Sequence, residues 1–102
     1  MKAAAKSAPR FRGAPVDVVV DVRSHIEFWL GSLPGAVCVP VTNLPEGLGK
    51  HEGVSQASRI LVYCASGNRS AAAAAMLTQA GYRNVVDGGG IGAASQHFTA
   101  GE

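Results

Sequence analysis

The apolar positions of this chain fall into two alternating kinds of segment. β-Branched or apolar runs without a helical period predict strands, and these runs are residues 16–22, 37–39, 59–63 and 84–86. Segments with helix caps or residues of high helix propensity predict helices, and these are residues 24–30, 44–48, 69–80 and 91–98. The alternation of strands and helices predicts an α/β domain with a mainly parallel central sheet and helices on both faces.

Capping residues and glycines indicate where several of these predicted elements begin and end. Ser24 with Glu27 three residues later forms a capping-box pattern, and the next apolar residues, Phe28 to Leu30, are expected to give that helix an apolar face. Gly31 is expected to end this helix. The three glycines of residues 88–90 predict a tight loop between the last strand and the last helix.

Length and composition indicate one ordered domain. The chain has 102 residues, of which 47% are hydrophobic and 16% charged, a balance that argues against a disordered chain or a coiled coil. The net charge of +2 is uneven, because four basic residues precede the first acidic one, Asp17. We expect residues 1–15 to be a basic, flexible arm and residues 16–102 to be the domain. Without interleaved aromatic residues, this arm does not indicate nucleic-acid binding.

The two cysteines are expected to have different roles. They lack C-x-x-C spacing, so neither a metal site nor a dithiol redox pair is indicated. Cys38 lies between two valines of a predicted strand and is expected to be an inert core residue. Cys64 follows a predicted strand directly, and ligands of parallel sheets bind at the carboxyl ends of strands.

The loop after Cys64 has the composition of an anion-binding loop. Its residues are Ala65, Ser66, Gly67, Asn68, Arg69 and Ser70. Loop amides, the positive end of the following helix and the Arg69 guanidinium would all lower the pKa of the thiol, as in the electropositive, partly exposed loops of reactive cysteines. Cys64 is therefore the candidate nucleophile. We expect Arg69 to bind the anionic group of a substrate, the alternative being a pair with a carboxylate.

One further carboxylate is predicted at the same edge of the sheet. Asp21 ends the first buried strand, where it would either pair with Arg23 or hydrogen-bond the loop amides in support of the site.

The spacing of the loop argues against phosphoryl chemistry. Loops of the C-x5-R type enclose a tetrahedral oxyanion, whereas Cys64 and Arg69 are separated by only four residues. The ring of backbone amides formed by this shorter loop is better suited to a single sulfur atom than to a phosphoryl group.

At this point the chain resembles the rhodanese-like sulfurtransferase family, over about residues 16 to 98. The matching motifs are Val20-Asp21-Val22-Arg23, Glu27-Phe28, Gly31 to Ala36, Cys64 to Ser70, and Gly81-Tyr82 followed by Val85, Gly89 and Gly90. The resemblance implies a three-layer α/β/α fold and a persulfide on Cys64, which would carry sulfur from a donor such as thiosulfate to cyanide or a thiol. Ala65 stands where many members that use thiosulfate have arginine, so we expect thiosulfate to bind weakly.

The resemblance also sets expectations about partners. We expect a small-molecule sulfur donor and an acceptor that is cyanide or a thiol, including a thiol on another protein. We expect no cofactor, no metal ion, no nucleic-acid partner and no association with a membrane. A monomer and a cytoplasmic location are the default expectations, and a periplasmic location stays open if an export signal has been removed. The alternative function is a catalytically weak module that binds a partner protein or senses oxidants through Cys64.

Overall fold

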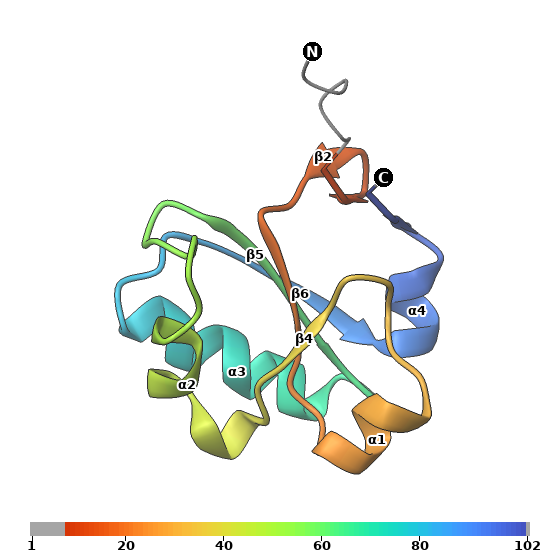
Figure 1. The fold of residues 1–102 in the computed structure, drawn as a ribbon, viewed down its shortest axis with the longest axis horizontal. Coiled ribbons are helices and arrows are strands. Elements are labelled where there is room, and N and C mark those ends of the chain that lie inside the picture. Colours follow the sequence, from red (N-terminus) through yellow and green to blue (C-terminus); the bar gives the residue numbers. More distant parts are fainter. Residues whose placement is uncertain (1–7, 102) are drawn as a thin grey trace.

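The computed structural model describes residues 8–101 and shows strands and helices in alternation (Figure 1). The strands are β1 (Arg10–Phe11), β2 (Ala14–Pro15), β3 (Val18–Asp21), β4 (Val37–Cys38), β5 (Arg59–Cys64), β6 (Asn84–Gly90) and β7 (Phe98–Thr99). The helices are α1 (His25–Leu30), the 3-10 turn η1 (Val41–Asn43), α2 (Glu46–Gly49), α3 (Asn68–Gln79) and α4 (Ile91–Ser95).

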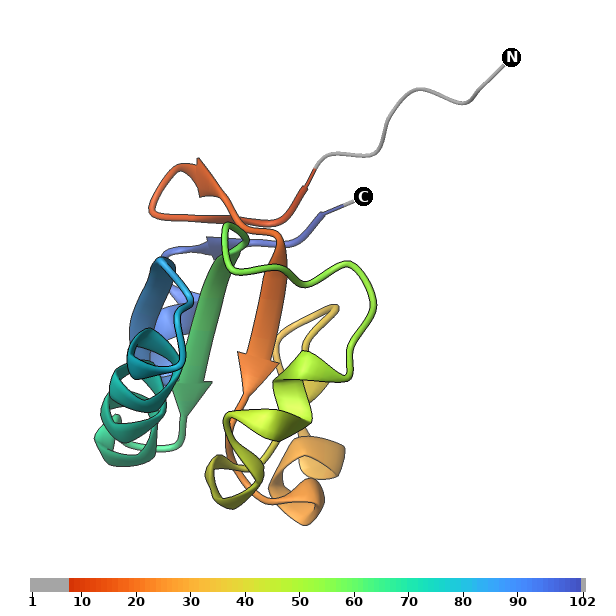
Figure 2. The same ribbon diagram turned by 90° about the vertical axis from the view of Figure 1, so that its left-hand side faces the viewer.

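The central sheet is parallel and has the strand order β4-β3-β5-β6. Its register places Val20 of β3 opposite Val62 of β5. Helices α2 and α3 lie on one side of this sheet and α4 on the other (Figures 1 and 2). Two buried apolar clusters fill the spaces between these layers, one that includes Leu48, Ala73 and Leu77 and one that includes Leu61, Tyr63 and Ala94. The predicted α/β fold with a mainly parallel sheet is confirmed.

Helix α1 begins and ends where the sequence predicts. Ser24 Oγ accepts a hydrogen bond from the Glu27 amide at 3.2 Å, and the Glu27 carboxylate accepts one from the Ser24 amide at 3.1 Å. The prediction that α1 packs through an apolar face is wrong, because none of its six residues is buried and Trp29 is 82% exposed. The helix is short and lies at the end of the sheet beside the site rather than over the face of the sheet (Figure 1).

The longest predicted helix and the strand before it are confirmed to within one residue. Strand β5 extends one residue further than expected and ends at Cys64, and α3 begins one residue earlier than expected. The helix predicted over residues 44–48 is observed as the four-residue helix α2, which begins two residues later than expected and ends one residue later, and the 3-10 turn η1 lies just before the predicted segment.

The predicted glycine loop over residues 88–90 is wrong. These residues continue β6, and Gly90 is paired with Cys64 across the two strands. A side chain on Gly88 would contact Leu61 at 3.0 Å and the Val62 carbonyl at 3.2 Å. Glycine therefore allows close approach between strands here, which sequence alone does not distinguish from a turn.

Part of the segment expected to be a flexible arm is packed on the domain. Phe11 is fully buried in the cluster with Tyr63, and β1 pairs with both β2 and β7 in a small antiparallel sheet. The first seven residues of the expected arm lie outside the described residues.

Candidate functional site

The site is built where β5 passes into α3. Cys64 is the last residue of β5, and its Sγ accepts hydrogen bonds from the Gly67 amide at 2.9 Å and the Ser70 amide at 3.3 Å. Gly67 precedes α3 with a φ of 103°, a left-handed conformation that glycine adopts without strain. The Ser70 hydroxyl donates to the Gly67 carbonyl at 3.1 Å and closes the loop. The chain thus folds back on one sulfur atom.

The end of strand β6 packs directly against the loop that follows Cys64. A side-chain carbon on Gly90 would lie 2.5 Å from the Ala65 carbonyl oxygen and 3.3 Å from the Cα of Ser66. Only glycine leaves room for the loop at position 90. The position of the loop therefore depends on Gly90, which lies 26 positions after Cys64 in the chain.

The environment of Cys64 favours its thiolate. Burial of the thiol raises its pKa, but hydrogen bonds from Ser70 and from the amides of Gly67 and Ser66 lower it by more, so the net pKa is below the ordinary value. Cys64 is fully buried, in contrast to the expected partial exposure, because its sulfur lies beneath the loop; Ala65, Ser66 and Asn68 are the exposed residues.

Arg69 is bound to a carboxylate. Its guanidinium donates to both carboxylate oxygens of Glu27, at 2.8 and 3.0 Å, and this bidentate pair joins α3 to α1. The structure therefore shows the alternative that the sequence left open for Arg69, and not a free guanidinium. The pair with Arg69, aided by the Ser24 amide, lowers the pKa of Glu27 to about 2, so this carboxylate is ionised over the whole working pH range.

Asp21 and Arg23 form a second, buried pair behind the site. The Asp21 carboxylate accepts hydrogen bonds from the Arg23 amide at 2.9 Å, from Nε at 2.9 and 3.1 Å, and from Nη2 at 2.7 Å. Arg23 also donates to the Gly31 carbonyl at the end of α1 and lies over the Tyr63 ring at 5.8 Å. Of the two roles weighed for Asp21, pairing with Arg23 is the one observed.

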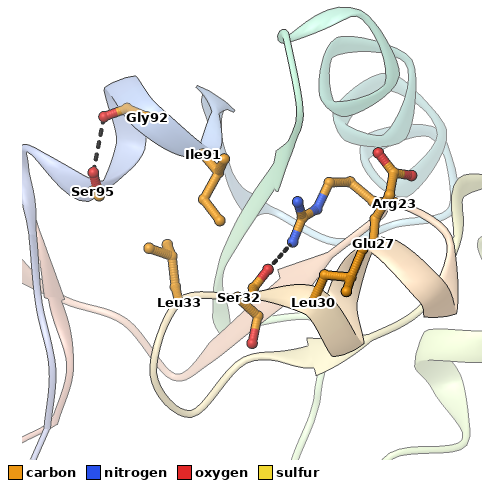
Figure 3. Close-up of a pocket in the computed structure, with 9 residues that line it drawn as sticks. Arg23, Glu27, Leu30, Ser32, Leu33, Ile91, Gly92 and Ser95 are labelled. Carbon is orange, nitrogen blue, oxygen red and sulfur yellow. Dashed lines mark hydrogen bonds between the residues drawn. The ribbon is translucent and has the colours of Figure 1, made fainter.

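An open groove of about 570 Å³ lies between α1 and the start of α4 (Figure 3). Its lining residues come from α1, the turn after it and the start of α4, and they are Arg23, Glu27, Leu30, Gly31, Ser32, Leu33, Ile91, Gly92 and Ser95. Ile91 directly follows Gly90, so the groove begins next to the residue that faces Cys64. Leu30, Leu33 and Ile91 give the groove an apolar character (Figure 3).

Sequence reasoning missed part of this site. It placed Cys64, the loop, Asp21 and Arg23 at one edge of the sheet, and the structure brings them together there. It gave Glu27 a capping role and placed Gly90 in a turn, and it assigned neither of them to the site. No local signal pairs Glu27 with Arg69, since they are 42 positions apart.

The described residues 8–101 hold no group of three or more histidine, cysteine or acidic side chains that could bind a metal ion. Over the same range, no helix is long and apolar enough to cross a membrane.

The two thiols are expected to titrate in opposite directions from an ordinary cysteine. Burial raises the pKa of Cys38, whose Sγ lies 3.6 Å from the Arg23 carbonyl oxygen, whereas the loop lowers that of Cys64. In the variant Cys38→Ser, thiolate absorbance should appear at a lower pH than for an ordinary cysteine, and in Cys64→Ser at a higher pH. Ultraviolet titration of the two single-thiol variants measures this, and the reverse order would contradict the site.

Comparisons with known proteins identify one matching protein family and several relatives. A model described as "Rhodanese-like domain" matches residues 4–91. A sulfurtransferase of Allochromatium vinosum is 33% identical over 81 residues, covering 78% of this chain and 73% of that protein. A Schizosaccharomyces pombe protein, provisionally named as a mitochondrial thiosulfate sulfurtransferase, is 33% identical over 78 residues and 67% of this chain.

The relatives differ in their names and in how much of their own length this chain covers. The chain spans 55% of the Schizosaccharomyces pombe protein. It spans 24% of a tRNA uridine(34) hydroxylase of Prochlorococcus marinus, with 31% identity over 75 residues and 67% of this chain. Among solved structures, a rhodanese-like domain of an Anabaena protein superposes with a TM-score of 0.72 at 25% identity, covering 88% of this chain and 67% of that one.

Proposed function

Because the chain belongs to the rhodanese-like domain family, we propose that it is a sulfurtransferase that carries a sulfane sulfur as a persulfide on Cys64. The observation that carries the proposal is the convergence of the Gly67 and Ser70 amides on one sulfur atom at a strand end. Two relatives named as sulfurtransferases support the same reaction class.

The reaction divides into two displacements at sulfur. In the first, the Cys64 thiolate bonds to the outer sulfur of thiosulfate, and the S–S bond breaks with its electron pair leaving on sulfite. In the second, cyanide or an acceptor thiolate bonds to the outer sulfur of the persulfide, and the Cys64 thiolate leaves. With cyanide as the acceptor, the products are sulfite and thiocyanate, Cys64 returns to its thiolate, and no external oxidant or reductant is needed.

The loop amides supply what both steps need. The anion lies on Cys64 Sγ before the first step and on the outer persulfide sulfur after it, so donors fixed around this point stabilise both states. The positive end of the twelve-residue helix α3 faces the same point. Because the loop lowers the pKa of Cys64, its thiolate forms more readily than that of an ordinary cysteine, and the proposed reaction uses it directly as the nucleophile without a separate general base.

The full burial of Cys64 favours a second candidate, a module with little turnover that binds a partner protein or senses oxidants. A buried sulfur must be uncovered before a donor reaches it, and α1 presents three strongly exposed apolar residues, Ile26, Trp29 and Leu30, beside the loop. The two candidates differ in one observable, the transfer of sulfur to and from Cys64.

Intact-protein mass spectra test the proposal directly. Protein incubated with a sulfane donor should gain the mass of one sulfur atom and lose it again when cyanide is added. Thiosulfate and an organic thiosulfonate should both be tried as donors, so that a weak response to one of them is not mistaken for absent chemistry. If neither donor adds sulfur, the sulfurtransferase proposal is wrong and the partner-binding module takes its place.

A further inference from the structure

Strand β6 forms one edge of the central sheet, and no described residue adds a strand beyond it (Figure 2). Its backbone pairs with β5, and within residues 8–101 no other segment forms a backbone hydrogen bond with residues 84–90. An edge strand directs a row of N–H and C=O groups away from the sheet, where another strand can bind them. Lysine and proline commonly protect such edges, and Asn84–Gly90 contains neither. The edge of β6 is therefore open to an added strand.

Only the first part of this edge is regular. Residues 84–87 pair in step with residues 59–62 of β5, and the register then shifts. Gly89, in the shifted part, has a φ of 77°, and its amide donates to the Asp87 carboxylate at 2.9 Å. A bulge of this kind bends the strand and interrupts pairing. An added strand would therefore align with the edge of β6 only as far as Asp87.

Two opposite charges lie at the ends of this regular part. Val85 and Asp87 are paired with Ile60 and Val62, which both belong to the buried cluster that includes Leu77, so Val85 and Asp87 are on the α3 face of the sheet. Continuing the strand alternation by one residue assigns Arg83 to the same face. Both charged residues are exposed, and neither forms a salt bridge with another residue of the described chain.

The order of these charges is self-complementary. In a pair of identical strands related by a two-fold axis, residue i faces residue j of the partner and residue j faces residue i. With antiparallel strands and the axis at Val85, Arg83 of each copy faces Asp87 of the other, which gives two attractive pairs. An axis at Arg83 or at Asp87 would place like charges opposite each other. The charges therefore favour one register, and the partner that fits this register is a second copy of the chain.

We propose that the protein associates as a two-fold dimer in which the β6 edges pair antiparallel about Val85 and join the two four-stranded sheets. This proposal departs from the monomer expected by default. Helix α3 packs against β6, and its exposed residues include Ala71, Ala72 and Ala75. These short side chains leave space on the α3 face for the helix of the second copy.

The dimer does not depend on the proposed sulfurtransferase function. Cys64 lies at the carboxyl end of β5, which is parallel to β6. Antiparallel pairing of the two β6 strands directs these carboxyl ends in opposite directions, so each copy keeps its own Cys64 loop away from the two-fold axis. Association and sulfur transfer can therefore be measured separately, and either can fail without the other.

Sedimentation velocity over a wide range of protein concentrations measures the association. The unmodified protein should pass from monomer to dimer as its concentration rises, and added salt should weaken the dimer because the charge pairs are exposed. Hydrogen exchange locates the contact, since the amides of residues 84–87 that point away from β5 should become protected as the dimer forms. A monomer at every concentration would overturn the proposal.

Charge reversal tests the register. Arg83→Asp and Asp87→Arg each turn both attractive pairs into repulsive ones, and each should raise the Kd of the dimer by about thirtyfold or more. An equal mixture of the two variants restores opposite charges at both contacts, so it should form a mixed dimer with a Kd close to that of the unmodified protein. A loss of stability in either variant would not be repaired by mixing.

Two further variants complete the test. Asp87→Asn keeps an oxygen that accepts from the Gly89 amide and should raise the Kd by only about fivefold, so it replaces Asp87→Arg if thermal melting shows that the reversal unfolds the protein. Lys50→Asp is the matched control for Arg83→Asp, because Lys50 is exposed and follows α2, which lies on the β3 side of the sheet away from β6 (Figure 2). Its Kd should be unchanged. A dimer that Arg83→Asp weakens no more than Lys50→Asp does would overturn the assignment to β6.

Discussion

Replacement of Cys64 with serine is expected to abolish sulfur transfer, lowering the rate by roughly a thousandfold or more, as when other covalent nucleophiles are removed. A hydroxyl ionises far above neutral pH and forms no persulfide, so the amides of Gly67 and Ser70 would then hold a group that cannot attack. The measurement is thiocyanate release from a sulfane donor and cyanide. Intact mass after incubation with donor should show no added sulfur.

Cys38→Ser is the matched control for this experiment. Cys38 lies on β4 and makes only a long contact with the Arg23 carbonyl, so its replacement should leave transfer within about twofold of the unmodified protein. Thermal melting of both variants, and of Cys64→Ala, separates loss of chemistry from loss of fold. Full activity in Cys64→Ser, or loss of activity in Cys38→Ser alone, would show that the nucleophile is wrongly assigned.

Replacement of Asp21 with alanine is expected to lower the free energy of unfolding by about 3–5 kcal/mol. The change leaves the Arg23 guanidinium, whose residue is 7% exposed, without the carboxylate that accepts its Nε and Nη2 hydrogens. A domain of this size has roughly 5–15 kcal/mol of stability in all, so the melting temperature should fall by well over 10 °C. Urea unfolding measures the effect.

Two further variants show whether the lost pair is the cause. Glu52→Ala removes an exposed acid and should change stability by at most about 0.5 kcal/mol. The double variant Asp21→Ala with Arg23→Met removes both charges, and it should lose less stability than the sum of the two single changes. A loss below about 1 kcal/mol in Asp21→Ala would mean that the buried pair is not what joins β3 to the end of α1.

The parts of the fold that sequence predicted are those with local causes. The Ser24–Glu27 capping box and the alanine-rich helix α3 depend on residues within one or two turns of each other, and both appear as expected. Strand β5 was predicted because its apolar run is continuous, as in strands buried on both faces. Cys64 was singled out for the same reason, since its loop is contiguous in sequence.

The errors have long-range causes. Gly88 and Gly90 form part of a strand because Leu61 and the Ala65 carbonyl leave no room for a side chain, and this crowding comes from segments far away in sequence. The Glu27 carboxylate joins Arg69 only after the sheet has brought α1 beside α3. Local patterns also cannot show that the apolar residues of α1 stay exposed, because that depends on what packs against the helix.

The small antiparallel sheet of β1, β2 and β7 lies at the end of the molecule opposite α1 and the Cys64 loop (Figures 1 and 2). Both outermost described segments of the chain are therefore directed away from Cys64. A linker that leaves the domain at these described segments would start at the end of the domain far from α1. Attachment through these two segments should therefore leave the face that carries α1 and the Cys64 loop open to solvent.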